Sequence, residues 1–239
     1  MMKETLHTKA YDWILNKILQ ENCPPGTSMK EEKLAEEIGI SATPVREALR
    51  QLEREGWLET IPYRGCFLKQ YTAIEIEELT ILRESVEVAS VPQFIKSADQ
   101  EDLAHLDDNI RKSEKLLAKI SKHEIPEGQC DYLKSELDAE FHHAIVVGTH
   151  CPRIIKLAAM WNQQLHHYAF RSLQQENNED STQNDDNYHY VINQHKAILL
   201  ALDLGWEKAA QELLRAHIAG SYMALKGISP HAKREQQTH

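Results

Sequence analysis

The chain has 239 residues, with 27 lysines and arginines against 37 aspartates and glutamates, and a formal net charge of -10. This composition, with 41% hydrophobic residues and only four scattered cysteines, excludes a disordered chain, a collagen-like fibre and a disulfide scaffold. No stretch approaches the ~18 apolar residues of a membrane span, and the opening residues lack a signal-peptide core, so we expect a cytoplasmic protein.

The first seventy residues carry the pattern of a small DNA-binding fold. Apolar residues at helical spacing predict a helix over 5–21, which ends at a Cys-Pro-Pro-Gly run. A short helix over 31–38 and a turn at Gly39 precede a third helix over 44–55, with Thr43 as its N-cap. Two short strands, 56–61 and 65–69, then flank a turn. Three helices followed by a hairpin are the plan of a winged helix-turn-helix.

Long amphipathic helices replace this pattern after residue 71. We predict about six of them, near 73–97, 100–122, 131–149, 152–173, 188–203 and 206–227, with Pro92 kinking or interrupting the first. Residues 174–187 contain no apolar side chain and are expected to form a mobile loop. The predicted fold class is therefore mainly α: a winged helix-turn-helix at 1–70, an all-α antiparallel helical bundle at 71–228 and a flexible tail at 229–239.

Arginines form a cationic stripe on the predicted 44–55 helix. Arg46, Arg50 and Arg54 recur every four residues and so share one face. Taken alone, such a stripe usually pairs with glutamates on a solvated helix face, here those at 47, 53 and 55. In a helix-turn-helix, however, this is the helix that enters the major groove. We therefore expect double-stranded operator DNA as a partner, although residues 1–70 carry 10 basic and 11 acidic side chains.

The N-terminal part resembles the DNA-binding domain of the GntR family of bacterial transcription regulators. The resemblance covers about residues 8–70 and is carried by TPVREAL, LEREG and RGCF. It implies that three residues of the third helix approach bases and phosphates in the major groove, and that two residues at the wing tip lie near the minor groove. The implied DNA-binding residues are Thr43, Arg46, Arg50, Arg64 and Gly65.

Two positions depart from the usual pattern of that family. Ala42 stands where the family usually has arginine, and Glu32 stands near a position that is basic in many members. An arginine that binds guanine in bidentate fashion contributes ~1–3 kcal/mol of base discrimination. Since Ala42 lacks this group, we expect an operator that differs from the common family half-site.

A second set of residues has the spacing of a metal site. Asp138 and His142 lie four residues apart in the predicted 131–149 helix, so their side chains point the same way. His195 lies ten residues before Gly205 and His217 twelve residues after it, which places the two imidazoles at nearly the same level of a helical hairpin. One buried histidine is usually a hydrogen-bonded core residue, but this combination favours a shared ion.

The helical part resembles the FadR C-terminal domain (FCD) type of effector domain, through LRESVE, LDAEFHHAI, QHKAILLAL and LLRAHI. The resemblance implies a divalent ion held by four side chains, Asp138, His142, His195 and His217. Zinc, nickel, manganese and iron all suit this set. It also implies that Arg83 binds the carboxylate of an effector, and a salt bridge from Arg83 to Glu87 is an equally good interpretation.

These features predict a ligand-responsive transcription regulator, expected to be a homodimeric repressor and not an enzyme. Its expected partners are operator DNA, a divalent metal ion and a small organic-acid effector. The alternative is a helical metal-dependent hydrolytic enzyme with an accessory DNA-binding-like domain, because an ion held by Asp and His can activate water. A third interpretation makes the ion purely structural. The sequence leaves the operator, the effector, the metal, the direction of regulation and the regulated genes open.

Overall fold

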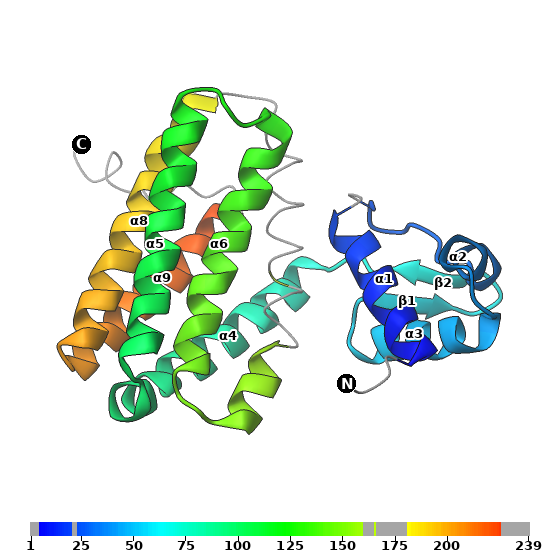
Figure 1. Cartoon of the computed structure of the whole chain (residues 1–239), viewed down its shortest axis with the longest axis horizontal. Helices are drawn as coiled ribbons and strands as arrows, with labels where there is room; N and C mark the ends of the chain where they lie inside the picture. The colour runs from blue at the N-terminus through cyan, green and yellow to red at the C-terminus, as the bar shows by residue number, and fades with distance from the viewer. Residues whose placement is uncertain (1–4, 21–22, 160–164, 166–180, 226–239) are drawn as a thin grey trace. The chain divides into compact units, whose positions relative to one another are not determined.

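The computed structural model describes residues 5–20, 23–159, 165 and 181–225. The chain divides into two compact units, Met1–Thr72 and Ala73–His239 (Figure 1). Each unit has a hydrophobic core of its own, and we describe each by itself.

The N-terminal unit contains α1 (Leu6–Gln20), α2 (Glu31–Ile38), α3 (Ala42–Arg54), β1 (Leu58–Ile61) and β2 (Gly65–Leu68). The strands pair antiparallel, with Leu58 opposite Leu68, and α1 packs against α3. The core includes Ile14, Ile18 and Leu52. Gly39 adopts φ 74°, a left-handed conformation that glycine reaches without strain, and turns the chain from α2 towards α3. The winged helix-turn-helix prediction is confirmed.

The start of α3 differs from the prediction. Ser41 occupies the N-cap position, so Thr43 and Pro44 lie inside the first turn, and the prediction that Thr43 caps the helix was wrong. Pro44 is tolerated there because the first N–H groups of a helix have no intrahelical acceptor. β1 begins later than predicted, because Gly56, with φ 84°, continues the turn that follows α3, and β2 ends one residue earlier than predicted.

The C-terminal unit is a helical bundle of α4 (Ala73–Ser97), α5 (Gln100–Ser121), α6 (Glu127–Val147), α8 (Ser181–Asp203) and α9 (Glu207–Leu225). Figure 1 shows α5, α6, α8 and α9 running lengthwise beside one another. α5 packs against α6 and α8, while α9 packs against α4 and α8. Phe94, Phe141 and Leu214 are among the residues that fill the core. Within the described ranges, no helix is both long and apolar enough to span a membrane.

Pro92 does not interrupt α4, contrary to one of the two predicted outcomes. A proline inside a helix leaves the carbonyl four residues earlier without its amide partner, and here that carbonyl belongs to Val88. Gln211 of α9 supplies the missing donor, since its Nε2 donates to the Val88 carbonyl at 3.2 Å. The helix therefore continues because a neighbouring helix replaces the lost hydrogen bond.

Two further predictions need correction at the helix ends. α8 begins at Ser181, so residues 181–187 are helical and not loop. Extending a helix that is already anchored by buried residues avoids the cost of nucleation, even for polar residues. α6 begins at Glu127, earlier than predicted. The predicted 152–173 helix is helical over 152–159 and at Leu165, and its remainder, the loop residues 174–180 and the tail at 229–239 lie outside the described residues.

Candidate functional site

The residues predicted to contact DNA all lie exposed on the N-terminal unit. Thr43, Arg46 and Arg50 project from α3, the second helix of the helix-turn-helix. Arg64 and Gly65 lie at the turn between β1 and β2. Gly65 has φ 108°, a left-handed conformation that favours glycine at this tight reversal. All five residues are therefore accessible to a binding partner.

The arginines of α3 differ in their surroundings. Arg46 does not pair with the glutamates of its own helix, but with Glu31 of α2: its Nε and Nη2 donate to the two carboxylate oxygens at 2.8 and 2.6 Å. Arg50 lies one turn further along α3 and, within the described part of the chain, forms no ion pair. Sequence reasoning missed Glu31, because its partner lies 15 residues away on another helix.

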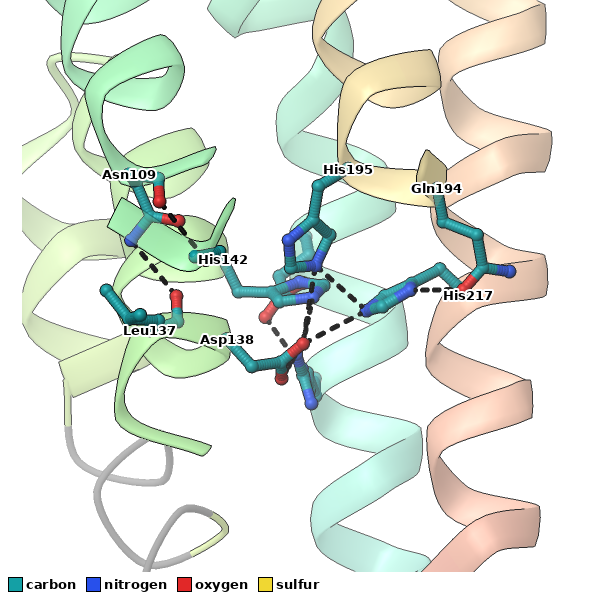
Figure 2. A network of polar contacts seen from close by, with 10 residues as sticks. Asn109, Leu137, Asp138, His142, Gln194, His195 and His217 are labelled. Carbon is teal, nitrogen blue, oxygen red and sulfur yellow. Dashed lines mark hydrogen bonds and ion pairs between the residues drawn. The ribbon is translucent and has the colours of Figure 1, made fainter. Parts of the chain in front are cut away.

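A cluster of four polar side chains lies inside the helical bundle (Figure 2). Asp138 and His142 come from α6, His195 from α8 and His217 from α9. Asp138 Oδ1 lies 3.3 Å from Nε2 of both His195 and His217, and 3.8 Å from Nε2 of His142. One ligand atom from each residue lies within 4.8 Å of the other three. The similar offsets from Gly205, ten and twelve residues, predicted that His195 and His217 lie at nearly the same level, and their Nε2 atoms are 3.3 Å apart.

Neighbouring oxygens orient two of the imidazole rings. Glu87 Oε2 lies 2.5 Å from Nδ1 of His142, and Gln194 Oε1 lies 2.9 Å from Nδ1 of His217. Carboxylate and amide oxygens accept hydrogen bonds, so these two Nδ1 atoms carry the protons and donate them. The Nε2 atoms of His142 and His217 then keep their lone pairs. Both lone pairs are directed at the cluster.

The ring of His195 is positioned by stacking. It lies against Phe141 with a centroid separation of 3.9 Å and an interplanar angle of 8°. Its Nε2 is 3.3 Å from Nε2 of His217 (Figure 2). An apolar ring on one side of His195 leaves the nitrogen edge facing the other members of the cluster.

This arrangement fits a cation. His142 Nε2 is buried and has no hydrogen-bond partner within the described part of the chain, and Nε2 of His217 faces a carboxylate oxygen although both are acceptors. Acceptors that face each other in a protein interior are costly unless positive charge lies between them. Bonds of ~2.0–2.2 Å in a tetrahedral site separate neighbouring ligand atoms by about 3.3–3.6 Å, close to the 3.3 Å measured here. The residues therefore fit a divalent metal ion.

Charge states at the cluster also suit a cation. Burial alone raises the pKa of Asp138, but the charge interaction with His142 and the contacts with His195, His217 and Arg83 hold that pKa well below its usual value. Burial lowers the pKa of His195 to about 3 and also lowers the pKa of His217. The ionised form of Asp138 and the neutral forms of His195 and His217 are the forms that bind metals.

Arg83 of α4 lies beside the cluster and contacts two carboxylates. Its Nε donates to Glu87 Oε1 at 3.1 Å, and its Nη2 donates to Asp138 Oδ2 at 3.3 Å. The salt bridge to Glu87, one of the two interpretations of the sequence, is therefore present. The bond to Asp138 was not predicted. The side chain is only 13% exposed, so both bonds are largely shielded from water.

Sequence reasoning missed the roles of Gln194 and Asn109 beside the cluster, and it named Glu87 only as a partner of Arg83 and not of His142. Glu87 is fully buried, and a signal for this existed, because it shares a helix face with the core residues Val91 and Phe94. Gln194 immediately precedes His195, and no pattern distinguishes it from an exposed glutamine. Asn109 of α5 donates to the carbonyl of the residue before Asp138, at 3.0 Å, and holds α6 in place (Figure 2).

Comparisons with known proteins cover both units. Residues 6–68 match the family described as bacterial regulatory proteins, gntR family, and residues 78–220 match the FCD domain. The uncharacterised HTH-type transcriptional regulator YdhC of Bacillus subtilis is 24% identical over 223 residues, which are 93% of this chain and 92% of that protein.

Two solved structures share the fold with a TM-score of 0.73 each. The E. coli protein McbR/YncC is 20% identical, and the match covers 93% of this chain and 98% of that one. A putative GntR transcriptional regulator from Rhodococcus sp. RHA1 is 21% identical, with 92% and 97% covered. At these identities, the likeness establishes the fold alone.

Replacing Glu87 with alanine should strongly destabilise the C-terminal unit. The change removes the acceptor for both Arg83 and His142, and loss of one partner of a buried ion pair costs ~3–5 kcal/mol. Glu84→Ala is the matched control, because Glu84 lies on the same helix and pairs with Arg215 at the surface, where ~0–1 kcal/mol is expected. Denaturant unfolding of chelator-treated proteins measures both. Equal losses for the two variants would contradict the role given to Glu87.

Proposed function

Because the chain belongs to the GntR family of bacterial regulatory proteins and carries an FCD domain, we propose that it is a homodimeric repressor whose helical unit binds a divalent metal ion and a small organic acid. The family membership makes it a DNA-binding transcription regulator and not an enzyme, so the metal-dependent hydrolase is set aside. Its DNA partner makes the cytoplasm the expected place of action.

The proposed operator surface consists of Thr43, Arg46 and Arg50 on α3, with Arg64 and Gly65 on the wing. The supporting observation is their exposure on the helix that a helix-turn-helix inserts into the major groove. Arginine side chains there meet phosphates and base edges, while a wing contacts the flanking groove. The residues on α3 and those on the wing are proposed to bind one half-site together.

The proposed metal ligands are Asp138, His142, His195 and His217. The observation that carries this proposal is that their ligand atoms converge. The Nδ1 atoms of His142 and His217, on the far side of each ring, are hydrogen-bonded to Glu87 and Gln194. Residues of this kind behind the ligands fix ring orientation and tautomer in metal sites. When bound, the ion supplies positive charge and open coordination positions for an oxygen ligand.

The charge balance of the cluster supports an anionic effector. Metal binding requires the three imidazoles to be neutral, and in that state Asp138 and Glu87 contribute two negative charges and Arg83 one positive charge, so the group without the ion is net negative. A divalent ion reverses that sign and makes the site attractive to a carboxylate. Arg83 uses one N–H of Nε and one of Nη2 for its present partners, and its remaining N–H groups are available to an effector.

The DNA-binding proposal predicts the effect of two arginine substitutions. Arg46→Ala and Arg50→Ala should each weaken binding to the duplex that the wild-type protein enriches from a randomised pool. Each should also reduce the slope of log affinity against log salt by about 0.9, because one phosphate contact is lost. Arg111→Ala, which removes the same charge from the helical unit, should leave the slope unchanged. A folded double variant that binds as tightly as wild type would refute the assignment.

Metal content tests the proposed ligands. His195→Ala and His217→Ala should each lower the metal content of purified protein and its melting temperature, since the ion joins α6, α8 and α9 and its binding free energy stabilises the unit. His143→Ala is the control, because His143 neighbours a ligand but is not part of the cluster. It should retain the metal. Full occupancy by elemental analysis after removal of both His195 and His217 would show that the site is misplaced.

Thermal-shift measurements with a panel of small organic acids test the effector proposal. A carboxylate that is an effector should stabilise the metal-loaded protein and have little effect after metal removal, because only the loaded cluster is positive. Arg83→Lys keeps the positive charge but loses the forked donor of the guanidinium. The variant should therefore bind the organic acid more weakly while it retains the metal. The same stabilisation with and without metal would make the ion structural and place effector binding elsewhere.

A further inference from the structure

The ion pair between Glu31 and Arg46 connects the two helices of the helix-turn-helix. Glu31 is the first residue of α2, where the free N–H groups and the helix dipole favour a carboxylate. Its side chain is 21% exposed, whereas that of Arg46 is 54% exposed. The carboxylate is therefore the more firmly held partner, and the guanidinium extends from it towards solvent.

The two hydrogen bonds fix the orientation of the guanidinium. They use the Nε edge of Arg46, with its Nε and Nη2 donating to separate oxygens of Glu31. A guanidinium has five N–H donors, so both donors of Nη1 and one of Nη2 are left for another acceptor. A paired, forked contact also restricts the rotamers of a long side chain before any ligand arrives.

We propose that Glu31 is a positioning residue for operator binding, which holds the guanidinium of Arg46 so that its Nη1 edge meets a DNA phosphate. The proposal rests on the contact between Arg46 and DNA that we propose above. Arg50, which has no such ion pair in the part of the chain that the structure describes, must be ordered by the DNA itself. Glu31 thus contributes to affinity although its own charge repels DNA.

The sign of the effect separates positioning from simple electrostatics. A carboxylate within a Debye length of about 10 Å at 0.1 M salt repels phosphates, so its neutralisation alone strengthens binding. Positioning predicts the opposite for Glu31. Glu32 provides a matched control, because it is the next residue of α2, is exposed, and forms no ion pair with another described residue. Neutralising Glu32 removes the same charge without releasing Arg46.

The experiment compares E31Q, E32Q, R46A and the E31Q/R46A double variant, each as the full chain. The probe is the duplex that wild type enriches from a randomised pool, titrated at several salt concentrations. E31Q should bind about tenfold more weakly, with the salt slope reduced by about 0.9, whereas E32Q should bind at least as tightly as wild type. The double variant should bind no more weakly than R46A, because Glu31 favours binding only through Arg46 and its remaining charge repels DNA.

Each other outcome has a distinct meaning. If E31Q binds as tightly as wild type with an unchanged slope while R46A binds weakly, the positioning role is overturned and the DNA contact of Arg46 stands. If E31Q weakens binding further in the R46A background, Glu31 acts independently of Arg46 and the inference also fails. If R46A itself binds like wild type, the proposed contact is wrong. Melting curves check folding, which loss of an exposed ion pair should leave intact.

Discussion

The carboxylate of Asp138 is the group around which the helical unit is organised. One of its oxygens lies against the three imidazoles, and the other accepts a hydrogen bond from Arg83. The Asp138 side chain is 24% exposed, and a charge that is largely removed from water needs partners inside the protein. The partners of this one come from α4, α6, α8 and α9, so satisfying a single negative charge requires four helices to meet at one level of the bundle.

The two arginine–carboxylate pairs illustrate how burial changes what the same kind of contact contributes to stability. Arg83 and Glu87 are shielded from solvent, where breaking a pair strands a charge and is strongly destabilising. Arg46 and Glu31 lie at the surface, where the same chemistry contributes little to stability and acts mainly on geometry. Breaking the buried pair is therefore expected to change stability, whereas breaking the exposed pair is expected mainly to change how the arginine side chain is oriented.

Periodicity and spacing were sufficient for most of the fold and for two pairs of residues, and the resemblance to the FCD domain implied that the two pairs form one cluster. Asp138 and His142 follow from a one-turn separation, and His195 and His217 from similar distances to Gly205, ten and twelve residues. Spacing along the chain does not show which side chains of different helices meet. Glu87 and Gln194, which accept from the imidazole Nδ1 atoms, and Glu31, the partner of Arg46, were therefore found only in the structure. Local rules also failed at Pro92, where a side chain of another helix overrides the expected break.

The hydrogen bond from Gln211 to the carbonyl of Val88 makes the order of synthesis matter for this chain. The two residues are 123 positions apart, and at ~5–20 residues per second the ribosome needs about 6–25 s to pass from one to the other. During that interval α4 carries a helix-breaking proline without its compensating donor. The described core residues of the N-terminal unit all lie within 10–68 and are made before that interval begins, whereas α4 gains this hydrogen bond only after Gln211 has been synthesised.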